Sequence, residues 1–366
     1  MSMRIAGIGT AVPHHRISQA DAAAIAKHYS CETAAQERLF ETLYRRAGVA
    51  SRHSVVLDVS EGDLGGRQTF YAGEHPTTRQ RMQMYEEHAC DLATAAAIAA
   101  LKEAAIDPSR ITHLVTVSCS GFHAPGVDVG LMRRLPLPAG VSRTHIGFMG
   151  CQGALNGLRA ARAFVEADPS ACVLLCAVEL CSLHHQFGWD ADAIVANALF
   201  ADGAAAVVGL AEDSAGIGTS STPGSGYRLV ASGSTLIDDS EDAMSWRIGD
   251  HGFRMTLSPR VPDLICAHLR PWMERWLAPH GLAIDTVGSW AVHPGGPRIL
   301  AAFREATGLD AAALQTSASV LADFGNMSSP TVLFILDRLR RANAPLPCVA
   351  LAFGPGLAIE AALLSC

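Results

Sequence analysis

IGFMGCQGALNGL, residues 146–158, is the most informative stretch of the chain. A β-rich run over 142–148 leads into the glycine-flanked Cys151, and a helical pattern follows over 152–167. The dipole and the free N–H groups at the start of a helix favour a thiolate, which is the nucleophilic form of cysteine. The stretch therefore predicts a nucleophile at a strand-to-helix turn, while a buried structural thiol would suit the same position equally well.

Short β-rich runs alternate with longer amphipathic runs on both sides of this stretch. Strands are predicted at 4–9, 112–118, 142–148, 171–178, 204–210, 227–235, 287–292, 348–353 and 358–363. Helices are predicted at 86–105, 152–167, 262–278, 297–307 and 330–341. Two successive halves of such alternation predict an α/β fold in which helices cover sheets. The Gly/Ser/Thr-rich segment 211–226 is the predicted connection between the halves, which span 1–211 and 227–366.

Composition excludes several classes of protein. The 366 residues are 49% hydrophobic and 17% charged, which is typical of a globular chain and not of a disordered one. The net charge of 28 − 35 = −7, without any Lys/Arg-rich run, argues against a nucleic-acid binder or a polybasic membrane binder. No apolar stretch is long enough to span a bilayer, and the N-terminus lacks the apolar core of a signal peptide. We expect a cytoplasmic enzyme.

The ten cysteines have no framework spacing, which favours free thiols over disulfides. Five metal-ligand residue types lie close together in sequence: Cys172, Cys176, Cys181, His184 and His185. Their spacing matches no standard zinc site, and Cys172 and Cys176 fall within an apolar predicted strand. We therefore expect core cysteines and no metal. The phosphate-binding loops of nucleotide enzymes and the HExxH zinc motif are absent from the sequence.

Two further polar residues follow predicted strands or precede predicted helices. His293 ends the strand at 287–292 and enters a Pro-Gly-Gly loop, and Asn326 lies in DFGNMSSP, residues 323–330. Loops at strand ends are where α/β proteins usually place their sites. Either residue alone is ordinarily a cap or a loop hydrogen-bonder. Together with Cys151 they form a set that supports acyl transfer, in which His and Asn N–H groups stabilise an oxyanion or enolate.

The sequence resembles the type III polyketide synthases, the chalcone synthase superfamily on the thiolase fold. The resemblance covers nearly the whole chain and rests on seven motifs in order: PTTRQRMQMY (76–85), SCSGFHAP (118–125), GCQG (150–153), ALFADGA (198–204), HPGG (293–296), GNMSS (325–329) and FGPG (353–356). It implies a layered α-β-α-β-α fold of two similar halves. It also implies that Cys151 accepts the acyl group and that His293 and Asn326 complete a catalytic triad.

The resemblance further implies which residues line the substrate cavity. Phe200 matches the gatekeeping Phe of the family, and Ser328 belongs to the GNMSS motif. Four positions depart from the plant chalcone synthases: Met255 replaces a second gatekeeping Phe, Trp246 a glycine, and His184 and Cys119 threonines. Plain core packing is the alternative for Met255 and Trp246. The segment ELCSL, residues 179–183, is more similar to bacterial alkylresorcinol and alkylpyrone synthases.

By the same resemblance, the substrates are an acyl-CoA starter and malonyl-CoA, no cofactor is needed, and the protein is a homodimer. The phosphates of coenzyme A need cations, and Arg45, Arg46 and Arg52 fall in the region that the family uses. Arg46 matches best, and a solvated helix face explains Arg45 equally well. The expected product is a resorcinol, a pyrone or a related aromatic compound.

Three alternatives to this function remain at the level of sequence. A ketoacyl synthase of the fatty-acid initiation type would share the fold and the Cys/His/Asn set but would make a single condensation. HPGG and GNMSS argue against it. A chalcone-type synthase would use an aromatic starter. An inactive scaffold or partner subunit would only bind, and the presence of all three triad residues argues against that interpretation.

Overall fold

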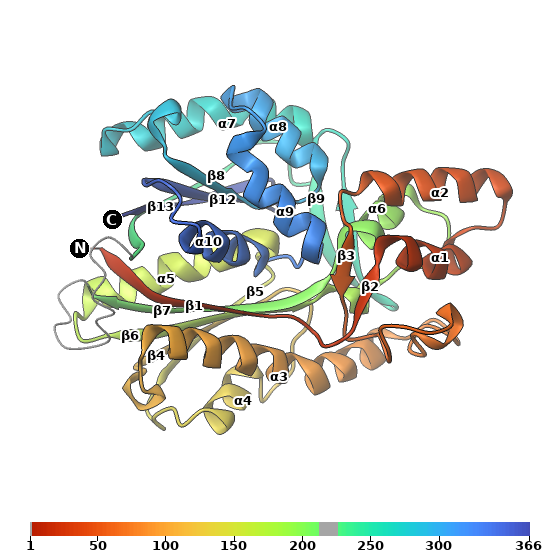
Figure 1. Ribbon diagram of the computed structural model, residues 1–366, viewed down its shortest axis with the longest axis horizontal. Coiled ribbons are helices and arrows are strands. Elements are labelled where there is room, and N and C mark those ends of the chain that lie inside the picture. Colours follow the sequence, from red (N-terminus) through yellow and green to blue (C-terminus); the bar gives the residue numbers. More distant parts are fainter. Residues whose placement is uncertain (1, 212–225) are drawn as a thin grey trace.

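Three layers of helices alternate with two layers of β-sheet in the computed structural model (Figure 1), which describes residues 2–211 and 226–366. Five strands form the first sheet: β1 (Met3–Ala11), β4 (His113–Ser118), β5 (Ser142–Gly147), β6 (Cys172–Leu180) and β7 (Asp202–Ala211). Their order is β5-β4-β6-β7-β1. β4 runs parallel to β5 and β6, whereas β7 is antiparallel to both β6 and β1.

The second sheet repeats this arrangement. It contains β8 (Arg228–Leu236), β11 (Ser289–Val292), β12 (Cys348–Gly354) and β13 (Ala358–Ser365), in the order β11-β12-β13-β8. β11 is parallel to β12, and the other two pairs are antiparallel, as in the series β4-β6-β7-β1. A short antiparallel pairing of Met3 with Leu229 and of Arg4 with Arg228 joins the two sheets. The layered α/β fold of two similar halves, predicted from the sequence, is thus confirmed.

The helices occupy three layers (Figure 1). α5 (Gly153–Ala167) and α10 (Thr331–Arg341) lie between the sheets, and their apolar faces join strands of both sheets in one hydrophobic core. The outer layers contain α3 (Thr78–Ala104) and α4 (Val127–Arg134) on one side, and α7 (Val261–Leu277) and α8 (Pro297–Thr307) on the other. α9 (Gln315–Phe324) precedes α10. Among the helices described, none is long and apolar enough to cross a membrane.

Close packing of α3 on β1 requires small residues on both elements. α3 begins at Thr78, eight residues before the start predicted from the sequence, and its N-cap Thr77 forms a capping box with Gln80. A Cβ atom on Gly9 would lie 2.2 Å from the carbonyl oxygen of Ala96, and one on Gly7 would lie 2.4 Å from that of Ala100. Only glycine permits this approach of strand and helix. Cys172 and Cys176 lie in the same core, as predicted.

A group of smaller elements covers one end of the layers (Figure 1). It comprises α1 (Gln19–Ser30), α2 (Ala34–Arg46), α6 (Ala191–Leu199), β2 (Arg16–Ser18), β3 (Ser51–His53), β9 (Met244–Gly249) and β10 (Gly252–Leu257). Sequence periodicity predicted none of them. β9 and β10 pair as a hairpin that sets Trp246 opposite Met255. The predicted connection at 211–226 lies outside the described residues except for its two ends.

Candidate active site

Cys151 lies in a tight turn between β5 and α5. The turn contains one 3₁₀ turn, Gly150–Gln152, and α5 begins at Gly153. Gly150 has a φ of +65°, and a Cβ atom there would lie 2.6 Å from Cδ of Pro355. Both facts require glycine, because an L side chain would be strained and would collide with the FGPG turn. The turn holds the Cys151 thiol at the N-terminal end of the central helix, where only 8% of the residue is exposed.

His293 and Asn326 lie at the same end of the layers, and each is 1% exposed. The His293 amide donates to the carbonyl oxygen of Leu351, at 2.8 Å, in the strand next to β11. Neither ring nitrogen of His293 has a hydrogen-bond partner among the residues that the structure describes. The side-chain oxygen of Asn326 accepts from the amide of Ser328 at 2.8 Å, which leaves the NH₂ group as the donor toward the cavity.

One buried cavity brings the predicted triad together. Cys151, His293 and Asn326 all line it, and it contains about 480 Å³ of empty space. The rest of its wall is largely apolar and includes Phe200 and Met255. A nucleophile, a base and an amide donor thus face one space that excludes most water, as acyl transfer through an enolate requires.

Burial controls the protonation of both the nucleophile and the histidine. Burial raises the pKa of Cys151 to about 11, while hydrogen bonds to Ser328 and Asn326 act in the opposite direction. Burial lowers the pKa of His293 to about 3. The resting site therefore holds a thiol and a neutral imidazole. A standing thiolate–imidazolium pair is opposed by burial.

Two more cavities meet the triad cavity at Phe200 and Met255, and both side chains line all three. The second cavity holds about 350 Å³ and is lined by Cys151 together with Cys119, Trp246 and Ser328. The third, of about 1000 Å³, is lined by Trp246 and His184 among others. All six residues predicted to bind substrate therefore line at least one of the three cavities, while their roles toward the substrate stay predictions.

Glu179 is a buried residue of the site that sequence reasoning did not single out. Its carboxylate accepts from the amides of Cys119 and Ser120, both at 2.9 Å, and from the hydroxyls of Ser120 and Ser329, both at 2.6 Å. It thereby fixes the turn after β4 against the GNMSS loop. The only sequence signal was a glutamate at the end of an unbroken apolar strand, where a charged side chain needs partners.

His184 connects two elements of the site by hydrogen bonds and also lines the third cavity. Its Nε2 lies 2.6 Å from the carbonyl oxygen of Ser120, and its Nδ1 accepts from the amide of Phe253 at 2.9 Å. The ring also stacks on Phe253 with a centroid distance of 4.2 Å. Burial lowers the pKa of His184 to about 3, so that the ring is neutral and bridges the β4 turn and the β10 strand.

The three predicted coenzyme A arginines separate into two groups. Arg45 and Arg46 are exposed in the last turn of α2, outside the lining of the triad cavity. Arg52 is only 6% exposed, and its Nη1 donates to the carbonyl oxygens of Asn197 and Phe200, both at 2.8 Å. These bonds hold the end of α6 and the backbone of Phe200, and the role of Arg52 as a ligand of coenzyme A phosphates stays a prediction.

No metal centre is evident in the described ranges, which contain no group of three or more His, Cys, Asp or Glu side chains suited to an ion. All ten cysteines fall within those ranges and are free thiols.

Two family models match the chain. The N-terminal domain of chalcone and stilbene synthases matches residues 2–212, and their C-terminal domain matches residues 228–366.

Similar proteins and structures cover almost the whole chain. The alpha-pyrone synthesis polyketide synthase-like Pks18 of Mycobacterium tuberculosis is 33% identical over 98% of this chain and 90% of its own length. The 1,3,6,8-tetrahydroxynaphthalene synthase of Streptomyces peucetius is 34% identical over 98% of this chain and 92% of its own length. The crystal structure of PKS-I from the brown alga Ectocarpus siliculosus is 32% identical, with a TM-score of 0.92 over 100% of this chain and 98% of that one.

Proposed function

Because the chain belongs to the chalcone and stilbene synthase family, the type III polyketide synthases, we propose that it builds a polyketide on Cys151 with the help of His293 and Asn326. As a member of this family it is an acyltransferase, and its family uses acyl-CoA and malonyl-CoA substrates. The observation that carries the proposal is the common cavity of the three residues, within which each is at least nine-tenths buried.

Loading begins with proton transfer. The neutral His293 accepts the proton of the Cys151 thiol as the acyl thioester arrives, and the sulfur attacks the thioester carbonyl. The bond between the carbonyl carbon and the coenzyme A sulfur breaks, and the leaving thiolate takes the proton from His293. Donors at the start of α5, together with Ser328 and Asn326, favour the thiolate during the attack.

Extension uses the same pocket after coenzyme A has left. The thioester oxygen of malonyl-CoA accepts hydrogen bonds from His293 and from the NH₂ group of Asn326. The apolar wall that includes Phe200 and Phe353 disfavours the malonyl carboxylate, which leaves as CO₂. The resulting enolate attacks the acyl carbonyl on Cys151 and releases its thiolate. The longer chain is now a coenzyme A thioester, and it returns to Cys151 when the Cys151 thiolate attacks its carbonyl carbon and the coenzyme A thiolate leaves.

We assign the triad cavity to the arm of coenzyme A. The cavity runs past Asp192 and Ala196 of α6 to Gly295 and Ile299 near the start of α8. The exposed Arg45 and Arg46 are the candidate phosphate ligands, and α2 packs against α6 in the same part of the fold. All steps use side chains of this chain, so that no cofactor beyond the thioester substrates is required.

The names of two relatives indicate the general class of product. One relative is named for alpha-pyrone synthesis and another for tetrahydroxynaphthalene synthesis. We propose repeated extension and closure to a resorcinol, a pyrone or a related aromatic product. Purified enzyme with a panel of acyl-CoA starters and malonyl-CoA tests this by product mass: several added two-carbon units support it, whereas a single condensation would indicate a ketoacyl synthase.

A homodimer is proposed from the surface next to the active site. Strand β5 lies at the edge of the sheet order, with all six residues exposed or half-exposed. The neighbouring Phe122 and Phe148 are 51% and 39% exposed, with ring centroids 5.9 Å apart. Edges of sheets and aromatic patches of this kind are normally covered by a partner. Sedimentation of the wild type and of Phe122→Lys tests this, since the variant is expected to favour the monomer.

A cytoplasmic location is the other part of this proposal. Ten free thiols are typical of proteins that remain in a reducing compartment. Cell fractionation of a tagged chain tests it, with recovery in the soluble fraction expected.

A further inference from the structure

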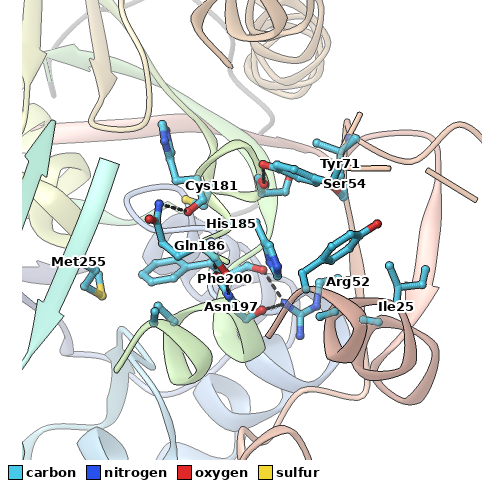
Figure 2. A pocket seen from close by; sticks show the side chains of 18 of the residues that line it. Ile25, Arg52, Ser54, Tyr71, Cys181, His185, Gln186, Asn197, Phe200 and Met255 are labelled. Atoms are coloured by element: carbon cyan, nitrogen blue, oxygen red, sulfur yellow. Dashed lines mark hydrogen bonds between the residues drawn. The ribbon is translucent and has the colours of Figure 1, made fainter. Parts of the chain in front are cut away.

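The third cavity, which we call the outer chamber, is bordered by Phe200 and Met255 and contains about 1000 Å³ of empty space; Figure 2 shows part of its lining. Phe200 and Met255 border both spaces, and so does Ala196 of α6. The outer chamber therefore begins where the triad cavity ends. An acyl chain attached to Cys151 reaches it by passing between these side chains, and Met255 is flexible enough to move aside.

The lining of the outer chamber is unusually polar for a pocket that would hold an alkyl tail. Arg52, Gln68, Tyr71, His185 and Asn197 line it alongside aliphatic residues of α1. Most of these polar groups bond to one another or to the backbone. The Gln68 amide donates to the Tyr29 hydroxyl at 2.7 Å, the Tyr71 hydroxyl donates to the carbonyl oxygen of Ser182 at 2.7 Å, and Asn197 donates to that of Gln186 at 2.8 Å.

Two nitrogens in the lining are exceptions. Nε of Arg52 and Nε2 of His185 are buried and have no hydrogen-bond partner within the described part of the chain. The His185 ring is directed toward the guanidinium of Arg52 (Figure 2). A buried polar group without a partner is strongly disfavoured in proteins, and in a native structure such a group usually marks a missing partner.

The charges around this pair indicate which kind of partner fits. All the hydrogen bonds of Arg52 go to uncharged oxygens: the carbonyls of Asn197, Ala198 and Phe200 and the side chain of Gln19. Burial lowers the pKa of His185 to about 3, so that its ring is neutral and can donate or accept. The acidic side chains of Asp202 and Asp190 lie nearby, and a carboxylate on the starter would be a third acidic group beside them. An uncharged oxygen suits the pair.

We propose that the outer chamber binds the far end of the starter acyl group, and that this end carries a hydroxyl or carbonyl oxygen held by Arg52 and His185. This proposal rests on the proposed function, since the starter must first be attached to Cys151. Such an oxygen accepts from Nε–H of Arg52 and completes the hydrogen bonding of the His185 ring. A plain alkyl end would leave both groups without a hydrogen-bond partner. For this reason, sites built to hydrogen-bond a substrate oxygen discriminate against analogues that lack it.

The test compares matched starters on the wild-type enzyme. Acyl-CoAs of six to twelve carbons are each paired with the ω-hydroxyacyl-CoA of the same length, and kcat/KM is measured with malonyl-CoA as extender. The best hydroxylated starter is expected to exceed its plain partner by about tenfold or more. Equal rates, or faster turnover of the plain chains, would overturn the proposal. Equal rates for the two starters are expected if the chamber holds only water.

Two variants locate the effect. His185→Phe keeps a ring of similar size but removes the nitrogen, so that the preference should fall severalfold, with Nε–H of Arg52 left to hold the oxygen. His75→Phe is the matched control, because His75 is exposed and stacks on Phe187 outside the chamber. It should keep the wild-type preference. A preference that stays at the wild-type level in His185→Phe would remove His185 from the proposal.

Malonyl-CoA decarboxylation by the wild type is measured in parallel. If CO₂ is released but the two starters react equally, only the chamber proposal fails. If no starter acylates the protein and no CO₂ appears, the proposed function itself fails.

Discussion

The indole N–H of Trp246 donates to the carbonyl oxygen of Cys119 at 2.7 Å, although the two residues are 127 positions apart in sequence. This bond fastens the β9–β10 hairpin to the turn that follows β4. The next carbonyl oxygen in that turn, on Ser120, is held by His184, and the amides of both residues are held by Glu179. Trp246 is therefore both a wall of the cavity beside Cys151 and a fixed part of its frame.

Removal of the indole should change the product. Trp246→Gly opens the wall shared by the second cavity and the outer chamber, so that chain length or starter preference should shift while Cys151 is still acylated. Product masses and a thermal melt measure both effects. A large aromatic residue truncated in a core costs about 3–5 kcal/mol, and this half-buried one should cost less. A destabilised variant that makes the wild-type products would show that Trp246 only packs.

Trp246→Phe separates the effect of the side-chain volume from the effect of the hydrogen bond to Cys119. The ring stays, but the hydrogen bond to Cys119 is lost, so the hairpin should be held less firmly and the product mixture should broaden. A net loss of about 0.5–1.5 kcal/mol in unfolding free energy is expected for one hydrogen bond. An unchanged mixture would assign the effect of Trp246 to its volume alone.

Glu179→Gln should weaken the frame of the site. Oε2 accepts from the amides of Cys119 and Ser120, and a glutamine can keep an oxygen in that place, but its NH₂ group then replaces Oε1, so that the Ser329 hydroxyl must reverse and the second contact of the Cys119 amide is lost. The loss of that hydrogen bond should cost about 0.5–1.5 kcal/mol, to be measured by urea unfolding. Slower acylation of Cys151 should accompany it. A variant with wild-type stability would contradict the role given to the carboxylate.

Asn326→Ala should slow the decarboxylation of malonyl-CoA by about 10²–10³, the usual effect of removing one oxyanion donor. The readout is CO₂ release in the absence of a starter, with the thermal melting temperature as the control for folding. CO₂ release at the normal rate would remove Asn326 from the mechanism.

The pH dependence of thiol alkylation tests His293 as the base. Burial holds the pKa of Cys151 near 11, so without a base the reactive thiolate is scarce at pH 7. In His293→Ala, the rate of alkylation by iodoacetamide should be low at pH 7 and should rise about tenfold per pH unit toward pH 11. The wild type should react faster at pH 7 and depend less steeply on pH. Identical profiles would show that His293 does not take the proton.

The sequence predicted the layered fold because buried strands and amphipathic helices leave clear periodic patterns. It predicted Cys151, His293 and Asn326 as candidates because each adjoins a strand end or a helix start. It did not predict the structural contacts of Arg52, since nothing in the residues around an arginine says that its guanidinium is buried among backbone carbonyls. It also missed the hairpin, because the role of Trp246 depends on a contact across 127 residues.

Acylation of Cys151 is the central claim, and intact-protein mass spectrometry after addition of a starter acyl-CoA tests it most directly. The wild type should gain the mass of one acyl group. Cys151→Ala should gain none and should melt at nearly the same temperature, because alanine fits a site that holds cysteine. Cys119→Ala, which removes the neighbouring thiol, should still be acylated. An adduct that persists in Cys151→Ala would contradict the assignment.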